Sequence, residues 1–209
     1  MRPHLAGEIS VWLPLQLYGC FQHLWGTMGN AILLAEADVV LARARAGDLD
    51  ALEKVYRAYE VPVYNLARRI CRTAEDAEDV LQETFYEVCR SIRQYRGEGS
   101  LWGWVRTIAA SKALMRLRRN RYREADELNE ELQPPTGMRV DGSLRMDLEA
   151  ALERLPETSR AVVWLHDVEG YTHEEIAGLM GKTVSFSKSQ LARAHLRLRR
   201  WLGEEAAET

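Results

Sequence analysis

The chain has 209 residues, a formal net charge of −3 at pH 7 and 46% hydrophobic residues, which is enough for one or two domains with a real core. Three cysteines, Cys20, Cys71 and Cys89, are too few and too scattered for a disulfide framework, so we expect reduced thiols in a cytosolic protein. Alternating apolar and polar runs are almost absent and helical spacing is common, so the predicted fold class is all-α.

Residues 1–37 form an apolar N-terminal extension, in which no charge falls between Glu8 and Glu36. A membrane-spanning helix needs roughly 20 mostly apolar residues. This stretch is long enough, but several helix-breaking residues interrupt it: Pro14, Gly19, Gly26 and Gly29. A signal peptide fits poorly, because no cationic cluster precedes an apolar core. Three alternatives stay open: a loosely packed or disordered extension upstream of a start at Met28, an arm that contacts a partner or membrane, and a transmembrane helix.

Residues 38–123 are predicted to form the first helical domain. Asp38 to Arg72 is a long amphipathic stretch with apolar residues at helical intervals. Asp48 is the expected cap of a helix that starts there. Pro62 is expected to begin or bend a helix and not to lie within one.

The next predicted helix covers residues 73–92. Thr73 with Asp76 resembles a capped start, and acids in the first turns suit the positive end of a helix dipole. Its buried stripe is Val80, Leu81, Phe85 and Val88, and its outward face shows Asp79, Gln82, Glu83 and Glu87. Such a row of acids and amides can dock a partner protein. An ordinary solvated surface is the alternative.

A basic, aromatic tract follows. Residues 97–100 predict a loop, and Leu101 opens a helix that contains Trp102 and Trp104. Between Arg90 and Arg123 ten cations face one acid, Glu98: Arg90, Arg93, Arg96, Arg106, Lys112, Arg116, Arg118, Arg119, Arg121 and Arg123. Rings beside a glycine-rich loop and a basic tract are typical of single-stranded nucleic-acid binding. Trp104 is expected in the core, whereas the role of Trp102 stays open.

Residues 124–146 are predicted to be a flexible acidic linker. From Glu124 to Ala150 eight acids face two arginines, and Pro134, Pro135 and Gly137 interrupt any periodicity. A charge distribution that gathers cations in the basic tract and in the last helix suits an extended polyanion as partner.

Residues 147–203 are predicted to be a second helical domain, followed by a tail at 204–209. A short helix at 147–155 precedes one over Glu157 to Val168, which Gly170 can end in a left-handed cap. Thr172 and Glu175 form a capping box, so a further helix starts there. Gly181 then breaks the chain, and Ser185 or Ser187 is expected to cap a last helix that reaches Trp201.

The last helix has the composition of a recognition helix. Leu191, Ala194, Leu198 and Leu202 form its buried stripe, and no acid occurs from Ser185 to Gly203. Its first turns offer short, amide or cationic side chains, which can meet base edges in a major groove: Ser187, Lys188, Ser189 and Gln190. A basic helix that closes a small bundle is the alternative. The capped short helix and glycine turn before it favour a helix-turn-helix.

Two stretches resemble the extracytoplasmic function (ECF) group of sigma-70-type sigma factors. The first, Ala77-Glu78-Asp79-Val80-Leu81-Gln82-Glu83-Thr84-Phe85, resembles the group's core-binding helix. The second runs from Leu155-Pro156-Glu157 through Glu169-Gly170-Tyr171-Thr172-His173-Glu174-Glu175-Ile176-Ala177 to Arg193-Ala194, and resembles its promoter-reading domain. The resemblance covers roughly residues 38–202.

The resemblance implies a sigma factor that directs core RNA polymerase to promoters, binds the −35 element as duplex and melts the −10 element. It assigns polymerase docking to Asp79, Gln82 and Glu83. It assigns the −10 element to the segment around Gly97–Trp104 and the following helix, with Arg96, Ser100, Trp102, Ser111, Arg116, Arg118 and Arg119 as contacts. It assigns the −35 element to Thr172, Ser187, Lys188, Ser189, Gln190, Arg193 and Arg197.

The sequence departs from the group's pattern in two places. Ala110, Ser111 and Met115 stand where the group usually shows Arg-Asn and then an Asp, so two alternatives stay open: base capture at the −10 element is absent, or its base preference differs. Ser185-Phe186-Ser187 stands where Gly-Thr-Val is frequent, so the −35 sequence cannot be borrowed from relatives.

Partners implied are core RNA polymerase and promoter DNA, with an anti-sigma factor as an open further partner and with no cofactor, metal or small-molecule substrate. The expected localisation is cytoplasmic, with membrane association through the extension or an anti-sigma factor as a further option. A helix-turn-helix regulator that is not a polymerase subunit is the alternative function. An enzyme is not expected: the zinc pattern His-Glu-x-x-His is not met, since Ala177 lies four residues after His173.

Overall fold

The computed structural model describes residues 37–97, 99–127 and 144–205. Within these ranges the chain is helical and contains no strand, so the all-α prediction is confirmed. The predicted apolar extension, apart from Ala37, and most of the predicted linker and tail lie outside the described residues. None of the helices in the described ranges is long and apolar enough to cross a membrane.

The first helical bundle contains α2 (Ala37–Arg45), α3 (Leu49–Ile70), α4 (Ala74–Ser91), a short 3-10 turn at Ile92–Gln94 and α5 (Leu101–Glu127). The Asp48 carboxylate accepts hydrogen bonds from the Asp50 and Ala51 amides at 3.0 and 3.3 Å, so the predicted cap of α3 is confirmed. Apolar side chains that recur at helical spacing on α3, α4 and α5 form the shared core: Val55, Val63, Leu66, Ile70, Val80, Val88, Val105 and Leu114.

Pro62 lies inside α3, so the prediction that it would not lie within a helix was wrong. A proline in a helix interior removes one hydrogen bond and costs about 3 kcal/mol. The buried stripe of α3 continues on both sides of it, through Tyr59 and Val63, both under 5% exposed. Burial of that stripe against α4 and α5 outweighs the local cost.

The second helical bundle contains α6 (Leu144–Arg154), α7 (Glu157–Val163), a π-helical segment (Trp164–Val168), α8 (His173–Met180) and α9 (Val184–Glu205). The predicted helix over 157–168 is thus present as α7 followed by the π-helical segment. Gly170 and Gly181 have positive φ values of 72° and 61°, as expected for chain reversals that only glycine adopts without strain. The helix ends differ slightly from prediction, because α5 continues past Arg123 and α6 starts before Asp147.

The cap of α9 was predicted wrongly. The side chain of Thr183, not of Ser185 or Ser187, accepts the Phe186 amide at 3.1 Å, and α9 starts at Val184. Threonine is a good cap, but the sequence offers three hydroxyl residues within five positions. Only the turn geometry after Gly181 decides which of them lies at the helix start.

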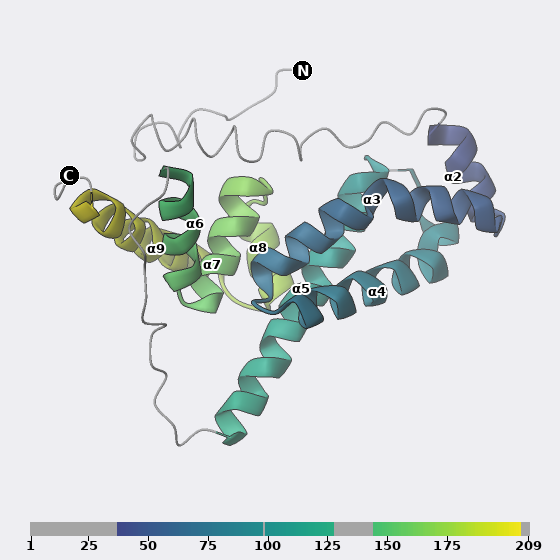
Figure 1. The fold of residues 1–209 in the computed structure, drawn as a ribbon. Helices are drawn as coiled ribbons and strands as arrows, with labels where there is room; N and C mark the ends of the chain where they lie inside the picture. Colours follow the sequence, from purple (N-terminus) through teal and green to yellow (C-terminus); the bar gives the residue numbers. More distant parts are fainter. Residues whose placement is uncertain (1–36, 98, 128–143, 206–209) are drawn as a thin grey trace.

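The two bundles pack against each other in this structure (Figure 1). Figure 1 shows α2 to α5 on one side and α6 to α9 on the other, with α3 against α7 and α5 against α8. Cys71, at the end of α3, is a buried free thiol close to this boundary, and Cys89 is an exposed free thiol, whereas Cys20 lies outside the described residues. Burial raises the pKa of Cys71 to about 12, so this thiol is not ionised at neutral pH.

Candidate functional site

The outward face of α4 carries the predicted protein-docking residues. The Thr73 hydroxyl accepts the Asp76 amide at 3.1 Å, so the predicted capped start is confirmed. Val80, Phe85 and Val88 are buried on the opposite face. Gln82 and Glu83 are exposed, and the Asp79 side chain is 48% exposed. These three side chains therefore form a polar, mainly acidic surface on a rigid helix.

Sequence reasoning missed an exposed aromatic on the same face. Tyr86 is 70% exposed, although it is a large side chain. It lies three residues after Glu83 and four after Gln82, which places it on their side of α4. Tyrosine is enriched among residues that dominate binding energy at protein interfaces. The helical spacing to Gln82 and Glu83 was the signal in the sequence that could have revealed it.

The loop before α5 is held by its own hydrogen bonds. Gly97 and Gly99 both have φ of 80°, and the Tyr95 hydroxyl donates to the Gly99 carbonyl at 2.9 Å. The Ser100 hydroxyl accepts the Gly103 amide at 3.0 Å, so Ser100 caps α5. Arg96 and Ser100 are both exposed on this loop.

Both tryptophans after the loop are half-buried against tyrosines of the first bundle. Trp102 stacks on Tyr59 with ring centroids 5.5 Å apart, and Trp104 lies 5.2 Å from Tyr95. Trp104 thus packs against the core, as predicted. Trp102 has the same kind of packing and is likewise only partly buried, so a base contact by its exposed part stays a prediction.

Some arginines of the basic tract on α5 contact other groups of the protein, and others are only exposed to solvent. Arg116 has a side chain only 10% exposed; its Nε lies 2.9 Å from Asp76 and its Nη2 pairs with Asp79. Arg118 donates to the Leu179 carbonyl of α8 at 3.3 Å, and Arg119 is exposed. Ser111, earlier on the same helix, is half-buried. One predicted DNA contact, Arg116, therefore pairs with one predicted polymerase contact, Asp79.

This division predicts effects of very different size on stability for two neighbouring substitutions. Arg116→Ala is expected to lower the free energy of unfolding by about 2 kcal/mol, since the partly buried carboxylates of Asp76 and Asp79 lose their ion-pair partner. Arg119→Ala is expected to change it by less than about 0.5 kcal/mol, because the side chain is exposed. Urea unfolding of the full chain measures both. Equal losses of stability in the two variants would contradict the assignment.

The helix-turn-helix is built as predicted. Thr172 Oγ1 accepts the Glu175 amide at 3.2 Å and the Glu175 carboxylate accepts the Thr172 amide at 2.8 Å, which confirms the capping box. Ile176, Ala177 and Met180 bury one side of α8. Leu191, Ala194 and Leu198 bury one side of α9. The Thr172 side chain is thus used within the protein, although the residue itself is exposed.

The predicted base-reading residues of α9 point to different sides. Lys188, Ser189, Arg193 and Arg197 are exposed. Ser187 is 1% exposed, with its hydroxyl 2.9 Å from His173 Nδ1. The side chain of Gln190 accepts a hydrogen bond from the Ser159 hydroxyl at 2.8 Å. The solvent face of α9 is therefore cationic, and two of the predicted contacts bind the scaffold in this structure.

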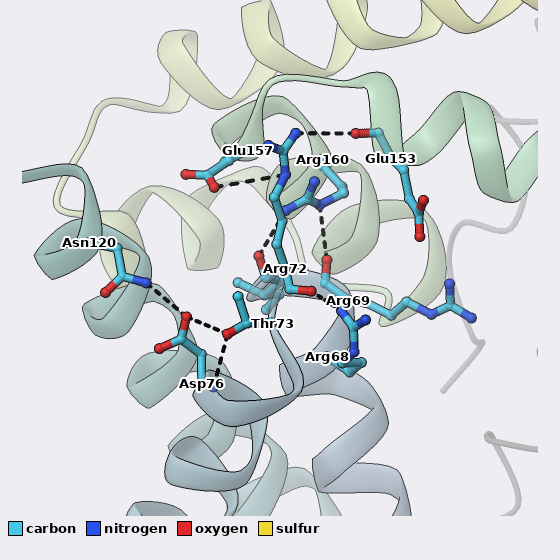
Figure 2. A network of polar contacts seen from close by, with 10 residues as sticks. Arg68, Arg69, Arg72, Thr73, Asp76, Asn120, Glu153, Glu157 and Arg160 are labelled. Carbon is cyan, nitrogen blue, oxygen red and sulfur yellow. Dashed lines mark hydrogen bonds and ion pairs between the residues drawn. The ribbon is translucent and has the colours of Figure 1, made fainter. Parts of the chain in front are cut away.

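A buried arginine joins the two bundles (Figure 2). Arg160 of α7 is 6% exposed and donates to the carbonyls of Arg69 and Ile70, at 3.2 and 3.3 Å. These are carbonyls of the last turn of α3, where the helix dipole is negative. Burial lowers the pKa of Arg160. Arginine still stays charged at neutral pH, so the contact is a charge-assisted cap.

Further contacts surround Arg160. Arg72 donates to the Glu153 carbonyl at 3.3 Å, with its Nε 4.0 Å from the Glu157 carboxylate (Figure 2), and Arg69 lies 3.4 Å from the Glu149 carboxylate. All of these pair cations of α3 or of the segment just after it with acceptors of α6 and α7.

A second contact lies between α5 and the helix-turn-helix. Arg106 pairs with the Glu169 carboxylate at 3.5 Å and lies over the Tyr171 ring, 4.6 Å from its centroid. Burial raises the pKa of Glu169, and Arg106 acts against that rise. Together with the Arg118 contact to Leu179, it holds the basic side of α5 against the turn region of the second bundle.

Comparisons with known proteins agree with this division of the chain. A family model described as Sigma-70 region 2 matches residues 55–123, and one described as Sigma-70, region 4 matches residues 145–198. The chain is similar to the ECF RNA polymerase sigma factor SigE of Mycolicibacterium smegmatis, with 35% identity over 164 residues. That alignment covers 75% of this chain but only 63% of SigE, which is less than two thirds of its length.

Two further proteins show similarity to this chain. The ECF RNA polymerase sigma factor SigM of Mycobacterium tuberculosis is 32% identical over 164 residues, covering 78% of this chain and 83% of SigM. Among solved structures, the sigma factor RpoE in complex with the anti-sigma factor NepR from Bartonella quintana is similar, with 23% identity and a TM-score of 0.51. This match covers 72% of this chain and 96% of that chain, and it supports the fold alone.

Proposed function

Because the chain belongs to the extracytoplasmic function group of RNA polymerase sigma factors, we propose that it is a dissociable initiation subunit that directs core RNA polymerase to specific promoters. The observation that carries the proposal is the occurrence of both sigma regions in one chain and in the family's order, each with an exposed charged surface. The subunit binds and opens DNA and performs no bond chemistry itself, so it is not an enzyme and uses no cofactor or small-molecule substrate.

Core polymerase binds the outward face of α4. Asp79, Gln82 and Glu83 supply the polar contacts, and Tyr86 adds an aromatic side chain to the same surface. Exposed acids on a rigid helix favour a basic partner surface, because complementary charges speed association and fix the register. Glu83 is the best probe of this contact, since Asp79 also pairs with Arg116 inside the protein.

The −10 element binds along the loop before α5 and along α5 itself. Arg96, Ser100 and the partly exposed Trp102 lie at one end, and Ser111, Arg116, Arg118 and Arg119 follow along the helix. Extrusion of a base costs a few kcal/mol of stacking, which pocket contacts and cations offset. Arg118 uses Nη2 for the Leu179 carbonyl, and because the residue is exposed and a guanidinium has five N–H donors, it can also donate to a phosphate.

The −35 element binds the exposed side of α9. Ser189 and Arg193 face the base edges, while Lys188 and Arg197 meet phosphates. Thr172, Ser187 and Gln190 complete the predicted set, but their hydrogen bonds within the bundle favour a role in holding the reading helix. A phosphate contact of Lys188 or Arg197 contributes a salt-dependent term that does not depend on base sequence.

We assign the domains as residues 38–123 for polymerase docking and the −10 element, and 147–203 for the −35 element, joined by the acidic linker at 124–146. The localisation proposed for this function is cytoplasmic, where polymerase and promoters are. An anti-sigma factor is a further proposed partner, because a similar fold is known as a sigma factor in complex with one.

Co-elution with core RNA polymerase tests the proposal directly. The full chain, mixed with core polymerase and passed over a gel-filtration column, is expected to move into the polymerase fraction at one copy per enzyme. The alternative, a helix-turn-helix regulator that is not a polymerase subunit, predicts binding to duplex DNA while the chain elutes apart from polymerase. The latter pattern would overturn the proposed function.

A further inference from the structure

The reading helix α9 is joined to the second bundle by three polar contacts on its inner side. Ser187 Oγ lies 2.9 Å from His173 Nδ1 of α8. Gln190 accepts from Ser159 of α7 at 2.8 Å. His195 Nε2 lies 2.6 Å from Asp167 Oδ2 of the π-helical segment. The three contacts thus come from three different elements: α8, α7 and the π-helical segment.

Asp167 uses both carboxylate oxygens in this arrangement. Its side chain is 11% exposed, and Oδ1 lies 2.8 Å from His166 Nδ1 while Oδ2 binds His195. Burial raises the pKa of Asp167, but the hydrogen bonds from His166 and His195 together leave it below its usual value. An ionised carboxylate only accepts hydrogen bonds, so it assigns a proton to His166 Nδ1 and to His195 Nε2.

The contacts at Ser187 and at His195 belong to one continuous chain of groups. The His166 ring stacks on the His173 ring with centroids 4.4 Å apart. We call His195, Asp167, His166, His173 and Ser187 the histidine network. It starts and ends on α9, and at 1.5 Å per residue its two ends lie about 12 Å apart along the helix. Two fixed points at this separation set both the rotation and the axial position of α9.

The exposed reading residues lie between these two fixed points. Lys188, Ser189 and Arg193 all fall within the span from Ser187 to His195. A bidentate side-chain contact with a base edge tolerates little displacement, because both hydrogen bonds must keep their geometry. The network therefore controls how these side chains meet a major groove.

We propose that Asp167 is a positioning residue for −35 recognition. Through His195 and through the stacked His166–His173 pair, it holds α9 at the rotation and axial position in which its exposed side chains contact the −35 bases. The inference rests on the proposed function, and it adds a role for side chains that do not touch DNA. Within the described residues no group of three or more His, Cys, Asp and Glu side chains could hold a metal ion, so a hydrogen-bonding role suits the cluster.

The network also makes −35 recognition sensitive to acid. Burial lowers the pKa of His173, as do His166 and Lys188, while Glu174 and Asp167 act in the opposite direction. A histidine whose pKa is lower in the folded state stabilises that state above its unfolded pKa of about 6.5 and loses this contribution as the pH falls. Protonation of His173 adds a charge next to His166 and Lys188, which weakens the hold on α9.

The test uses transcription by the full chain with core polymerase on a pool of random promoters, and compares enrichment of the −35 and −10 elements. The −10 element serves as an internal control. Asp167→Asn is expected to reduce −35 enrichment about tenfold, which is the effect expected from the loss of one weak base contact. Enrichment of the −10 element is expected to stay unchanged. Between pH 7.5 and pH 5.5, the ratio of −35 to −10 enrichment is expected to fall in the wild type.

A matched pair at His195 separates positioning from packing. His195→Gln keeps an N–H directed at Asp167 and is expected to retain most −35 enrichment, whereas His195→Leu is expected to behave like Asp167→Asn. Unchanged −35 enrichment in both Asp167→Asn and His195→Leu would overturn the proposal, and so would equal losses in the two His195 variants. Absence of any enriched element in the wild type would instead contradict the proposed function, so the two failures are distinguishable.

Discussion

Glu83→Arg is expected to weaken binding to core RNA polymerase about a hundredfold, because charge reversal places a cation against a basic partner surface. Glu83 is exposed on α4 and is not held by the α4–α5 ion pairs that involve Asp76, Asp79 and Arg116. The substitution therefore changes the docking surface while leaving the bundle intact. Promoter-directed RNA synthesis is expected to fall by the same factor at limiting polymerase.

Fluorescence anisotropy of the labelled chain, titrated with core polymerase, measures this affinity. Glu53→Arg on α3 is the matched control, since it makes the same charge change at another exposed acid of the same bundle. Its affinity is expected to stay within about twofold of the wild type. Similar losses in both variants would show that the effect is one of net charge and would remove α4 as the docking surface.

Arg160→Ala is expected to have the largest effect on stability, lowering the free energy of unfolding by about 3 kcal/mol. The substitution leaves the last carbonyls of α3 without their charged donor and opens a cavity between the bundles. The two bundles are then expected to unfold separately, which broadens the urea transition.

Urea unfolding followed by circular dichroism measures the change, with Arg72→Ala as the control. Arg72 belongs to the same boundary, but its side chain is 49% exposed, so its loss is expected to cost no more than about 1 kcal/mol. A cost for Arg160→Ala as small as that for Arg72→Ala would indicate that the bundles are not joined in this way in solution.

Local signals in the sequence predicted most of the helix boundaries. The caps at Asp48, Thr73 and Thr172 were confirmed, because the partner of each cap lies within three residues. The chain reversals at Gly170 and Gly181 were predictable because glycine adopts a positive φ without strain. Pro62 was predicted wrongly, because packing of the long α3 stripe is decided by residues of other helices.

Contacts between distant residues could not be predicted from the chain alone. Nothing near Arg160 in the sequence indicates that its guanidinium reaches the end of α3. His195 lies 28 positions from Asp167, and its hydrogen bond depends on how α9 packs against the π-helical segment. The spacing of Asp79, Gln82 and Glu83 did predict their common exposed surface, but only the fold shows that Asp79 is shared with Arg116.

The most direct test of the central claim is transcription in vitro with core polymerase, the full chain and a pool of random promoters. The account predicts that the transcribed sequences share two short elements at a fixed spacing, one read as duplex by α9 and one opened by α5. Transcripts without any shared element, or a single shared element in place of two, would contradict the claim that two surfaces of this chain bind the promoter together.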